Sequence, residues 1–104
     1  MDLQPLACSY DADSATLFVS GSVDEVSGVV LRSKIVEHSD EYRRDLTLDL
    51  CGVDLLPSLG IGVIAVAQRN ADQLGATIDL VAAPGSVVQQ VLNVCGLPYS
   101  VRER

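Results

Sequence analysis

Residues 45–64 read DLTLDLCGVDLLPSLGIGVI, and this stretch decides the fold. Apolar and polar side chains alternate over Leu46–Leu50, which is typical of a strand with one buried face. The strand is expected to end at Gly52. A helix is predicted over Leu59–Leu74, with an almost wholly apolar first half and a polar second half. The segment therefore joins a strand to a buried helix through a turn that contains one serine, Ser58.

The sequence before this stretch predicts a hairpin and a helix. Ala15–Ser20 is rich in β-branched and aromatic residues, and Leu3–Tyr10 is its expected partner strand across the turn at residues 11–14. Pro5 has no backbone donor, which places the first strand at the edge of the sheet. A helix is expected over Ser27–Ser39, with Ser27 as its N-cap.

The sequence after this stretch predicts one more strand, Thr77–Val81, and a helix that starts at residues 84–86. One face of that helix comprises Val88, Val91, Leu92 and Cys95. Strands and helices thus alternate after the hairpin, and parallel strands need the crossovers that helices supply. The expected fold class is α/β: a mixed sheet of four to five strands with about three main helices packed on one face.

Size and charge restrict the function classes. The 104 residues suffice for one compact domain, residues 1–104, and 48% of them are hydrophobic. The net charge is -7, from 7 basic and 14 acidic residues, which disfavours nucleic acid and anionic lipid as partners. The apolar run Ile61–Ala67 is too short to cross a bilayer, so no membrane span is expected. Met1–Pro5 shows no secretory signal, and the expected location is the cytoplasm.

Three cysteines, Cys8, Cys51 and Cys95, lack the C-x-x-C spacing of zinc or thioredoxin-like sites. Buried, reduced thiols are the simplest interpretation. The alternative is a regulatory disulfide between Cys51 and Cys95.

The sequence contains little that indicates an enzyme. His38 is the single histidine and lies among polar residues of a predicted helix, so no triad can be assembled around it. The spacing Gly60-x-Gly62 is too weak a pattern to indicate nucleotide binding, and neither a P-loop nor a metal-ligand cluster is present. We therefore expect neither catalytic residues nor a metal or cofactor.

The serine in the central turn, Ser58, allows two interpretations. It lies at or next to the expected start of the helix, where its hydroxyl can cap a free backbone N–H. The same amides and the helix dipole would also favour a phosphate, so the position suits a reversible phosphoserine.

Four segments resemble the STAS domains, in particular the bacterial anti-sigma factor antagonists. Val53–Ile64, VDLLPSLGIGVI, is similar to the family's VDFIDSSGLGVL-type turn in length and at most positions. Gly21–Asp24, Leu74–Ala76 and Leu92–Leu97 resemble three further family segments in the right order, so the resemblance covers nearly the whole chain.

The resemblance implies a regulatory binding protein. In the family, the first serine of the turn is phosphorylated by an anti-sigma factor that is a serine kinase. The unphosphorylated form captures this kinase, which releases a sigma factor, so that phosphorylation is an off switch. Ser58 is the matching serine, and the implied partner-binding residues are Asp24, Asp54, Pro57, Ser58, Leu59, Gly60 and Ile61.

The sequence departs from the family turn at two positions. Pro57 stands in place of the usual aspartate, which removes a carboxylate and a backbone donor. Leu59 stands in place of the second serine and is either a core anchor or an exposed partner contact. The alternative function is accordingly a STAS scaffold or constitutive binding module without phosphorylation control. Homodimerisation also stays open at this point.

Overall fold

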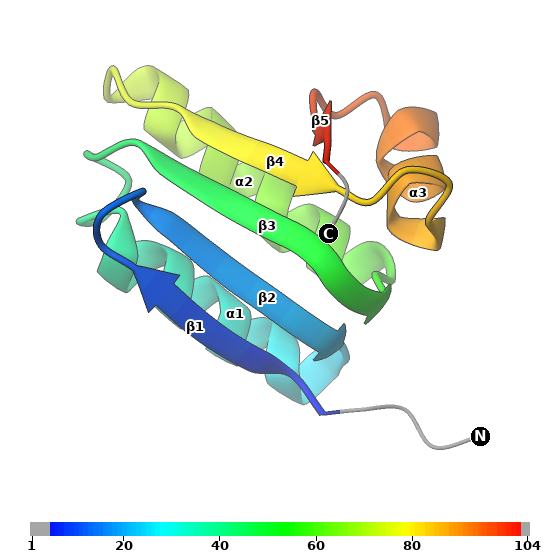
Figure 1. The fold of residues 1–104 in the computed structure, drawn as a ribbon. Coiled ribbons are helices and arrows are strands. Elements are labelled where there is room, and N and C mark those ends of the chain that lie inside the picture. Colours follow the sequence, from blue (N-terminus) through cyan, green and yellow to red (C-terminus); the bar gives the residue numbers. More distant parts are fainter. Residues whose placement is uncertain (1–4, 103–104) are drawn as a thin grey trace.

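The computed structural model describes residues 5–102, in which five strands and three helices follow one another. In chain order they are β1 (Ala7–Asp11), β2 (Thr16–Ser22), α1 (Glu25–His38), β3 (Leu46–Leu55), α2 (Ser58–Gln73), β4 (Ile78–Ala82), α3 (Val87–Cys95) and β5 (Ser100–Val101). The strands form one sheet in the order β1-β2-β3-β4-β5. β1 is antiparallel to β2, and the other neighbours are parallel, which confirms the predicted mixed α/β sheet (Figure 1).

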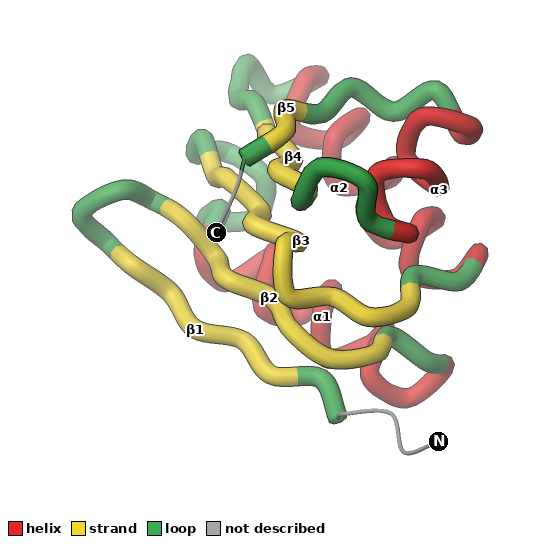
Figure 2. Tube along the Cα trace, turned by 45° about the vertical axis from the view of Figure 1, so that its right-hand side comes forward, coloured by secondary structure: helices red, strands yellow, loops and turns green. Residues whose placement is uncertain are grey.

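The helices share one core with one face of the sheet. α1 and α2 lie behind the strands in Figure 1, and α3 lies beyond the carboxyl end of β4. The buried cluster includes Leu17, Val19, Leu46, Leu48, Leu50, Ile78 and Leu80 from the strands and Leu31, Ile35, Ile64, Ala67, Val88 and Leu92 from the helices. Among residues 5–102 the opposite face carries no helix (Figure 2). None of the three helices is both long and apolar enough to cross a membrane.

The predicted start of α1 was wrong. The N-cap is Asp24, and Ser27 is the third helical residue. The two residues form a reciprocal capping box, in which each side chain accepts the backbone N–H of the other. Both residue types can cap a helix, so the sequence alone did not show which one would occupy the cap. Because the helix starts earlier, Gly28 is its fourth residue, and it is buried.

The predicted end of β3 at Gly52 was also wrong, because the strand continues to Leu55. Gly52 lies opposite Ser20 of β2, and a Cβ at this position would come within 2.9 Å of the Ser20 Cβ. Gly52 therefore permits a close approach of two strands and does not end either of them. β2 likewise continues past its predicted end to Ser22.

The remaining boundaries shift by a few residues. β1 is at the edge of the sheet, as Pro5 predicted, but it begins at Ala7, and Leu3 and Gln4 lie outside the described residues. α2 agrees with its prediction to within a residue. β5 pairs only with Val81 and Ala82 of β4, so the second edge of the sheet is largely uncovered.

Three consecutive residues after α1, Asp40, Glu41 and Tyr42, have φ angles of 52°, 56° and 67°. A left-handed turn of non-glycine residues costs about 1–2 kcal/mol per residue, so its surroundings must hold it in place. The Ser39 hydroxyl does so: it donates to the Ile35 carbonyl at 2.6 Å and accepts the Tyr42 backbone N–H at 3.0 Å.

Replacing Ser39 with alanine is expected to lower the free energy of unfolding by about 1–2 kcal/mol, because the Tyr42 N–H loses its acceptor and the Ile35 carbonyl keeps only its hydrogen bond from the Ser39 N–H. Thermal or urea denaturation checks this. Ser33→Ala is the matched control, because Ser33 is exposed on the same helix and should change the stability little. Equal stability of the two variants would contradict the role assigned to Ser39.

Candidate functional site

The polar turn and the start of α1 meet at one end of the sheet. β2 and β3 are parallel, so their carboxyl ends lie side by side, and the Val23 N–H donates to the Leu55 carbonyl at 3.2 Å. Asp24 follows the end of β2, and Ser58 follows the end of β3 by three residues. Both side chains are exposed at this end, at the lower right of Figure 1 where α1 and α2 begin. The structure thus brings together two residues that are far apart in the sequence.

Gly60, in the first turn of α2, packs closely against the end of β2. A Cβ on Gly60 would come within 2.7 Å of Leu56 Cδ1 and 3.0 Å of Val23 Cγ1. Both neighbours are buried, and Val23 is β-branched, so there is little room for them to move. Gly60 therefore determines how closely the Ser58 turn packs against the strand that leads to Asp24.

Asp24 is committed to the capping box. One carboxylate oxygen, Oδ1, accepts the Ser27 backbone N–H at 2.8 Å and the Ser27 hydroxyl at 2.9 Å. These hydrogen bonds, chiefly that of the backbone N–H, hold the pKa of Asp24 below its ordinary value of 3.8. The carboxylate is therefore ionised at neutral pH and places a negative charge at the amino end of α1.

The lowered pKa predicts how pH affects the folded protein. The contribution of Asp24 to stability is fully present above pH 3.8 and is lost as the pH falls through the lower folded-state pKa. An NMR titration of the Asp24 carboxyl is expected to give a midpoint below pH 3.8. Ser27→Ala should raise that midpoint towards 3.8. A midpoint at or above 3.8 in the wild type would contradict the capping geometry.

Ser58 does not cap α2. Pro57 is the N-cap, and its carbonyl accepts the Ile61 N–H at 3.1 Å, while Ser58 is the first helical residue. No side chain makes a cap hydrogen bond at this end, and no acidic residue lies in the first turn. The capping interpretation of Ser58 was therefore wrong. Its exposed hydroxyl lies at a helix N-terminus that no side chain caps, where a negative group would be stabilised.

Leu59, whose role was left open, is exposed and is not part of the hydrophobic core. A Cβ on Gly28 of α1 would be 3.2 Å from Leu59 Cδ2, so the leucine packs against α1 where that helix has no side chain. It is nevertheless 45% exposed. Leu59 thus links α2 to α1 and also presents apolar surface beside Ser58.

The apolar residues that α1 exposes were not predicted as part of the site. Val26, in its first turn, is 79% exposed, and Val29 and Val30 are also exposed. Their spacing of three and four residues, on the side opposite Leu31 and Ile35, was the signal available. We define the docking face as six of the exposed residues at this end of the sheet: Asp24, Val26, Asp54, Leu55, Ser58 and Leu59.

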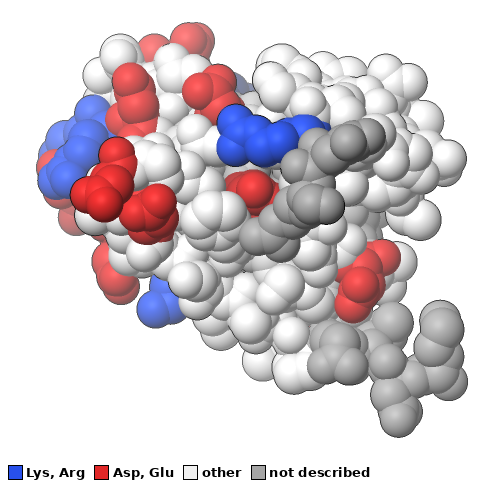
Figure 3. All heavy atoms as spheres, in the orientation of Figure 1, with Lys and Arg blue, Asp and Glu red and all other residues white. Residues whose placement is uncertain are grey.

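The other predicted partner-binding residues lie beneath this face. Gly60 is buried, and Pro57 and Ile61 are half-buried, with Ile61 packed against the core. They position the turn and offer little surface of their own. In Figure 3 many acidic side chains gather at the opposite end of the sheet, but the end with the docking face also carries the exposed acidic residues Asp24, Glu25 and Asp54. A phosphate on Ser58 would add further negative charge to this end of the molecule.

The cysteines form no disulfide in this structure. Cys8 is half-buried, and burial raises the pKa of its thiol, although Lys34 opposes this effect. The Cys51 thiol, on β3, contacts the Arg102 carbonyl at 3.5 Å, and Cys95 is exposed at the end of α3. The disulfide between Cys51 and Cys95 stays a prediction.

Comparison with known proteins agrees with this architecture. A family model described as "Mlab, STAS domain" matches residues 7–99. The anti-sigma-F factor antagonist RsfB of Mycobacterium tuberculosis, in strains CDC 1551 / Oshkosh and ATCC 25618 / H37Rv, is 27% identical over 89 residues, 85% of this chain and 70% of RsfB.

Two solved structures show the same fold. An anti-sigma factor antagonist from Mycobacterium paratuberculosis has a TM-score of 0.78 at 19% identity, covering 92% of this chain and 86% of that one. A putative anti-sigma factor antagonist from Thermotoga maritima has a TM-score of 0.69 at 15% identity, covering 95% and 86%. At these identities the structures establish the fold, and the family model spans nearly the whole chain. Together with the sheet order and the serine turn, this match means that the chain belongs to the STAS domain family.

Proposed function

We propose that this protein is an anti-sigma factor antagonist, which binds an anti-sigma factor through the docking face and so releases the sigma factor that it holds. The observation that carries this proposal is the exposed Ser58 at the start of α2, at the same end of the sheet as Asp24. The likeness to RsfB, an anti-sigma-F factor antagonist, supports the same role. The expected place of action is the cytoplasm.

We infer further that the partner is a serine kinase and that Ser58 is its substrate. In this step the γ-phosphoryl group of ATP is transferred to Ser58 Oγ, the hydroxyl proton is released, and ADP leaves. This chain acts as the phosphoryl acceptor and contributes no catalytic group. The exposed hydroxyl and the absence of a competing side-chain cap support this role.

The helix explains how a phosphate could be tolerated by the fold. A phosphate on Ser58, the first residue of the 16-residue α2, would lie beside backbone N–H groups and the positive end of the helix dipole. The phosphate would therefore not unfold the turn. It would instead add about two negative charges to the docking face, and burying these charges against a partner is unfavourable. Phosphorylation would thus act on binding.

Pro57 supports the alternative of constitutive binding. It occupies the N-cap and offers neither a carboxylate nor a hydroxyl that could orient Ser58 for a kinase. The docking face would then bind its partner whatever the state of Ser58. The two functions share a surface and differ only in their response to phosphorylation.

A capture experiment tests the proposal. Immobilised wild-type protein is exposed to cytosol of the native host, and the bound proteins are identified by mass spectrometry. The expected result is an anti-sigma factor with a serine kinase domain. The recombinant kinase and ATP should then add one phosphate to the wild type and none to Ser58→Ala. If the captured kinase leaves Ser58 unmodified, the constitutive alternative replaces phosphorylation control, and capture of no anti-sigma factor overturns the antagonist role.

A further inference from the structure

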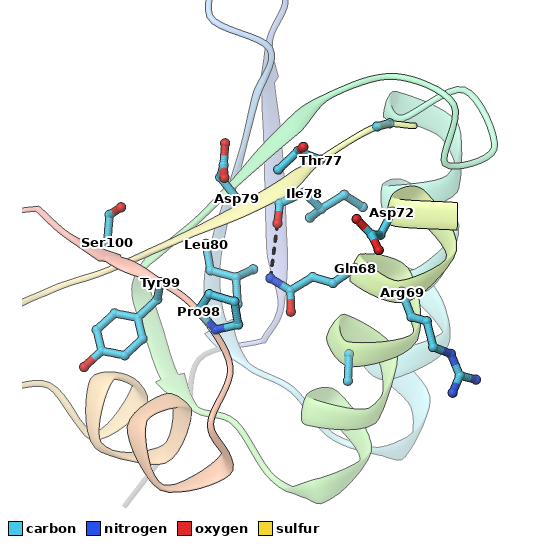
Figure 4. Close-up of a pocket in the computed structure, with 12 residues that line it drawn as sticks. Gln68, Arg69, Asp72, Thr77, Ile78, Asp79, Leu80, Pro98, Tyr99 and Ser100 are labelled. Carbon is cyan, nitrogen blue, oxygen red and sulfur yellow. Dashed lines mark hydrogen bonds between the residues drawn. The ribbon is translucent and has the colours of Figure 1, made fainter. Parts of the chain in front are cut away.

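A second surface lies at the uncovered edge of the sheet. A cavity of about 540 Å³ opens between α2, the first half of β4 and the residues that lead into β5 (Figure 4). Its lining comprises Ala65, Gln68, Arg69, Asp72, Ala76, Thr77, Ile78, Asp79, Leu80, Pro98, Tyr99 and Ser100. The α2 residues among them lie about 10–20 Å along the helix from Ser58. The cavity is therefore separate from the docking face.

The cavity exists because β5 is only two residues long. Ser100 pairs with Val81 and Val101 with Ala82, so the described chain provides no strand beside Ile78–Leu80 on the side away from β3. The outer edge of Ile78–Leu80, about 10 Å long, therefore has no neighbouring strand and faces α2. This space has the position and direction of the missing first half of β5.

One side chain takes the place of the missing strand. The Thr77 carbonyl accepts the Leu46 N–H at 3.1 Å and so faces β3. Because successive carbonyls of a strand alternate in direction, the Ile78 carbonyl faces the cavity. It accepts the Gln68 side-chain amide Nε2–H at 3.1 Å, drawn as a dashed line in Figure 4. Gln68 thus supplies the donor that a neighbouring strand would supply.

The charges around the cavity indicate what would fit it. Asp72 and Asp79 both line it and are exposed. In Figure 4 the Arg69 guanidinium extends away from the strand, whereas the Asp72 carboxylate lies on the side of α2 that faces Thr77. The surroundings therefore favour basic groups, in a chain with a net charge of -7.

We propose that this cavity is a docking site for an extended segment of a partner protein, which pairs with Ile78–Leu80 and continues β5. Alternate residues of the segment would point to opposite faces of the sheet. Apolar residues would pack against Ala65 on α2, where a small side chain leaves room, and basic residues would face Asp79. The main-chain hydrogen bonds would provide the affinity. When the segment binds, the hydrogen bond from the Gln68 side chain to the Ile78 carbonyl would break, and the segment would donate to that carbonyl instead.

The probe for this site is the blocked peptide acetyl-VKVKVK-amide, added to the ¹⁵N-labelled full-length protein. The expected result is a change in the amide signals of Ile78 and Leu80 together with slower hydrogen exchange there, and binding that weakens as salt is added. In a segment parallel to β4 whose valines face α2, the lysine N–H groups point towards β4. A peptide of the same sequence with N-methylated lysines, which cannot donate those hydrogen bonds, should therefore bind at least tenfold more weakly. No anti-sigma factor takes part, so the result is independent of the proposed function.

Paired variants keep this test specific. Ala65→Phe places a large side chain in the cavity and should weaken peptide binding at least tenfold. Val66→Phe is the matched control, because Val66 is the next residue of α2, lies outside the cavity lining and is already 44% exposed. The amide spectrum of each variant reports whether its fold is intact. The double variant Asp72→Asn with Asp79→Asn should lower both the affinity and its salt dependence.

Several results would overturn this assignment. Equal binding by the two phenylalanine variants would place the peptide elsewhere. Signal changes at β1, Ala7–Asp11, of the same size as those at β4 would mean indiscriminate pairing with either edge of the sheet. No binding at millimolar peptide, or signal changes at the edge caused by self-association of the protein alone, would also contradict it.

Discussion

Ser58→Glu is expected to weaken binding of the anti-sigma factor by more than tenfold and to leave the fold intact. The glutamate adds a negative charge to the docking face near Asp24 and Asp54, and a tenfold loss corresponds to about 1.4 kcal/mol of binding free energy. The fold should tolerate the charge, because an acidic group at the first position of α2 interacts favourably with the helix dipole. Calorimetry with the captured anti-sigma factor measures the affinity, and thermal denaturation checks the fold.

Ser58→Gln is the matched control, because glutamine has the size of glutamate without its charge. It should bind much more tightly than Ser58→Glu, and Ser58→Ala should bind like the wild type. If the glutamate and glutamine variants bind equally weakly, side-chain size explains the loss. If both bind like the wild type, control by charge is ruled out and the constitutive alternative is favoured.

Gly60→Val is expected to lower the free energy of unfolding by about 2–3 kcal/mol, because it overpacks the contact between α2 and the end of β2. Its Cβ alone would lie 2.7 Å from Leu56 Cδ1 and 3.0 Å from Val23 Cγ1. For a domain of this size, that loss lowers the melting temperature by on the order of 10 °C or more. Thermal and urea denaturation measure the effect.

Gly62→Val provides the control in the same helix. Nothing lies within 4 Å of a Cβ at Gly62, so this variant should stay within about 0.5 kcal/mol of the wild type. Similar losses in both variants would indicate an effect of the residue type on the helix and would contradict the close approach at Gly60. Since Gly60 positions the Ser58 turn, Gly60→Val should also weaken binding of the anti-sigma factor.

The sequence determined the order of the elements and the fold class. Alternation over Leu46–Leu50 predicted the central strand, and the apolar first half of α2 predicted a buried helix to within a residue. Such periodic patterns are strong because the burial of each side chain follows directly from its position in the element. The resemblance in the serine turn and three further segments also indicated the family, which the family model confirms.

Only the tertiary structure decided the details on which the site depends. Gly52 looked like a strand end, but it allows β2 and β3 to approach each other. Ser58 looked like a cap, but Pro57 occupies that position. Glycine and serine each suit two local environments, and at Gly52 the contact with Ser20 of β2 selects between them.

The exposed surfaces of the protein also depended on contacts between distant parts of the chain. The side chain of Leu59 covers a glycine on another helix, which no local pattern reveals. Val26 is exposed although it is apolar, and only its position opposite Leu31 and Ile35 indicated this. The open edge of β4 arises because β5 is two residues long, and strand length depends on pairing across the sheet. The sequence by itself determined the type and order of the elements from β1 to α3, because side-chain period and polarity are local. The tertiary structure decided which exposed residues share a face and which strand edge stays open, because both depend on contacts between distant parts of the chain.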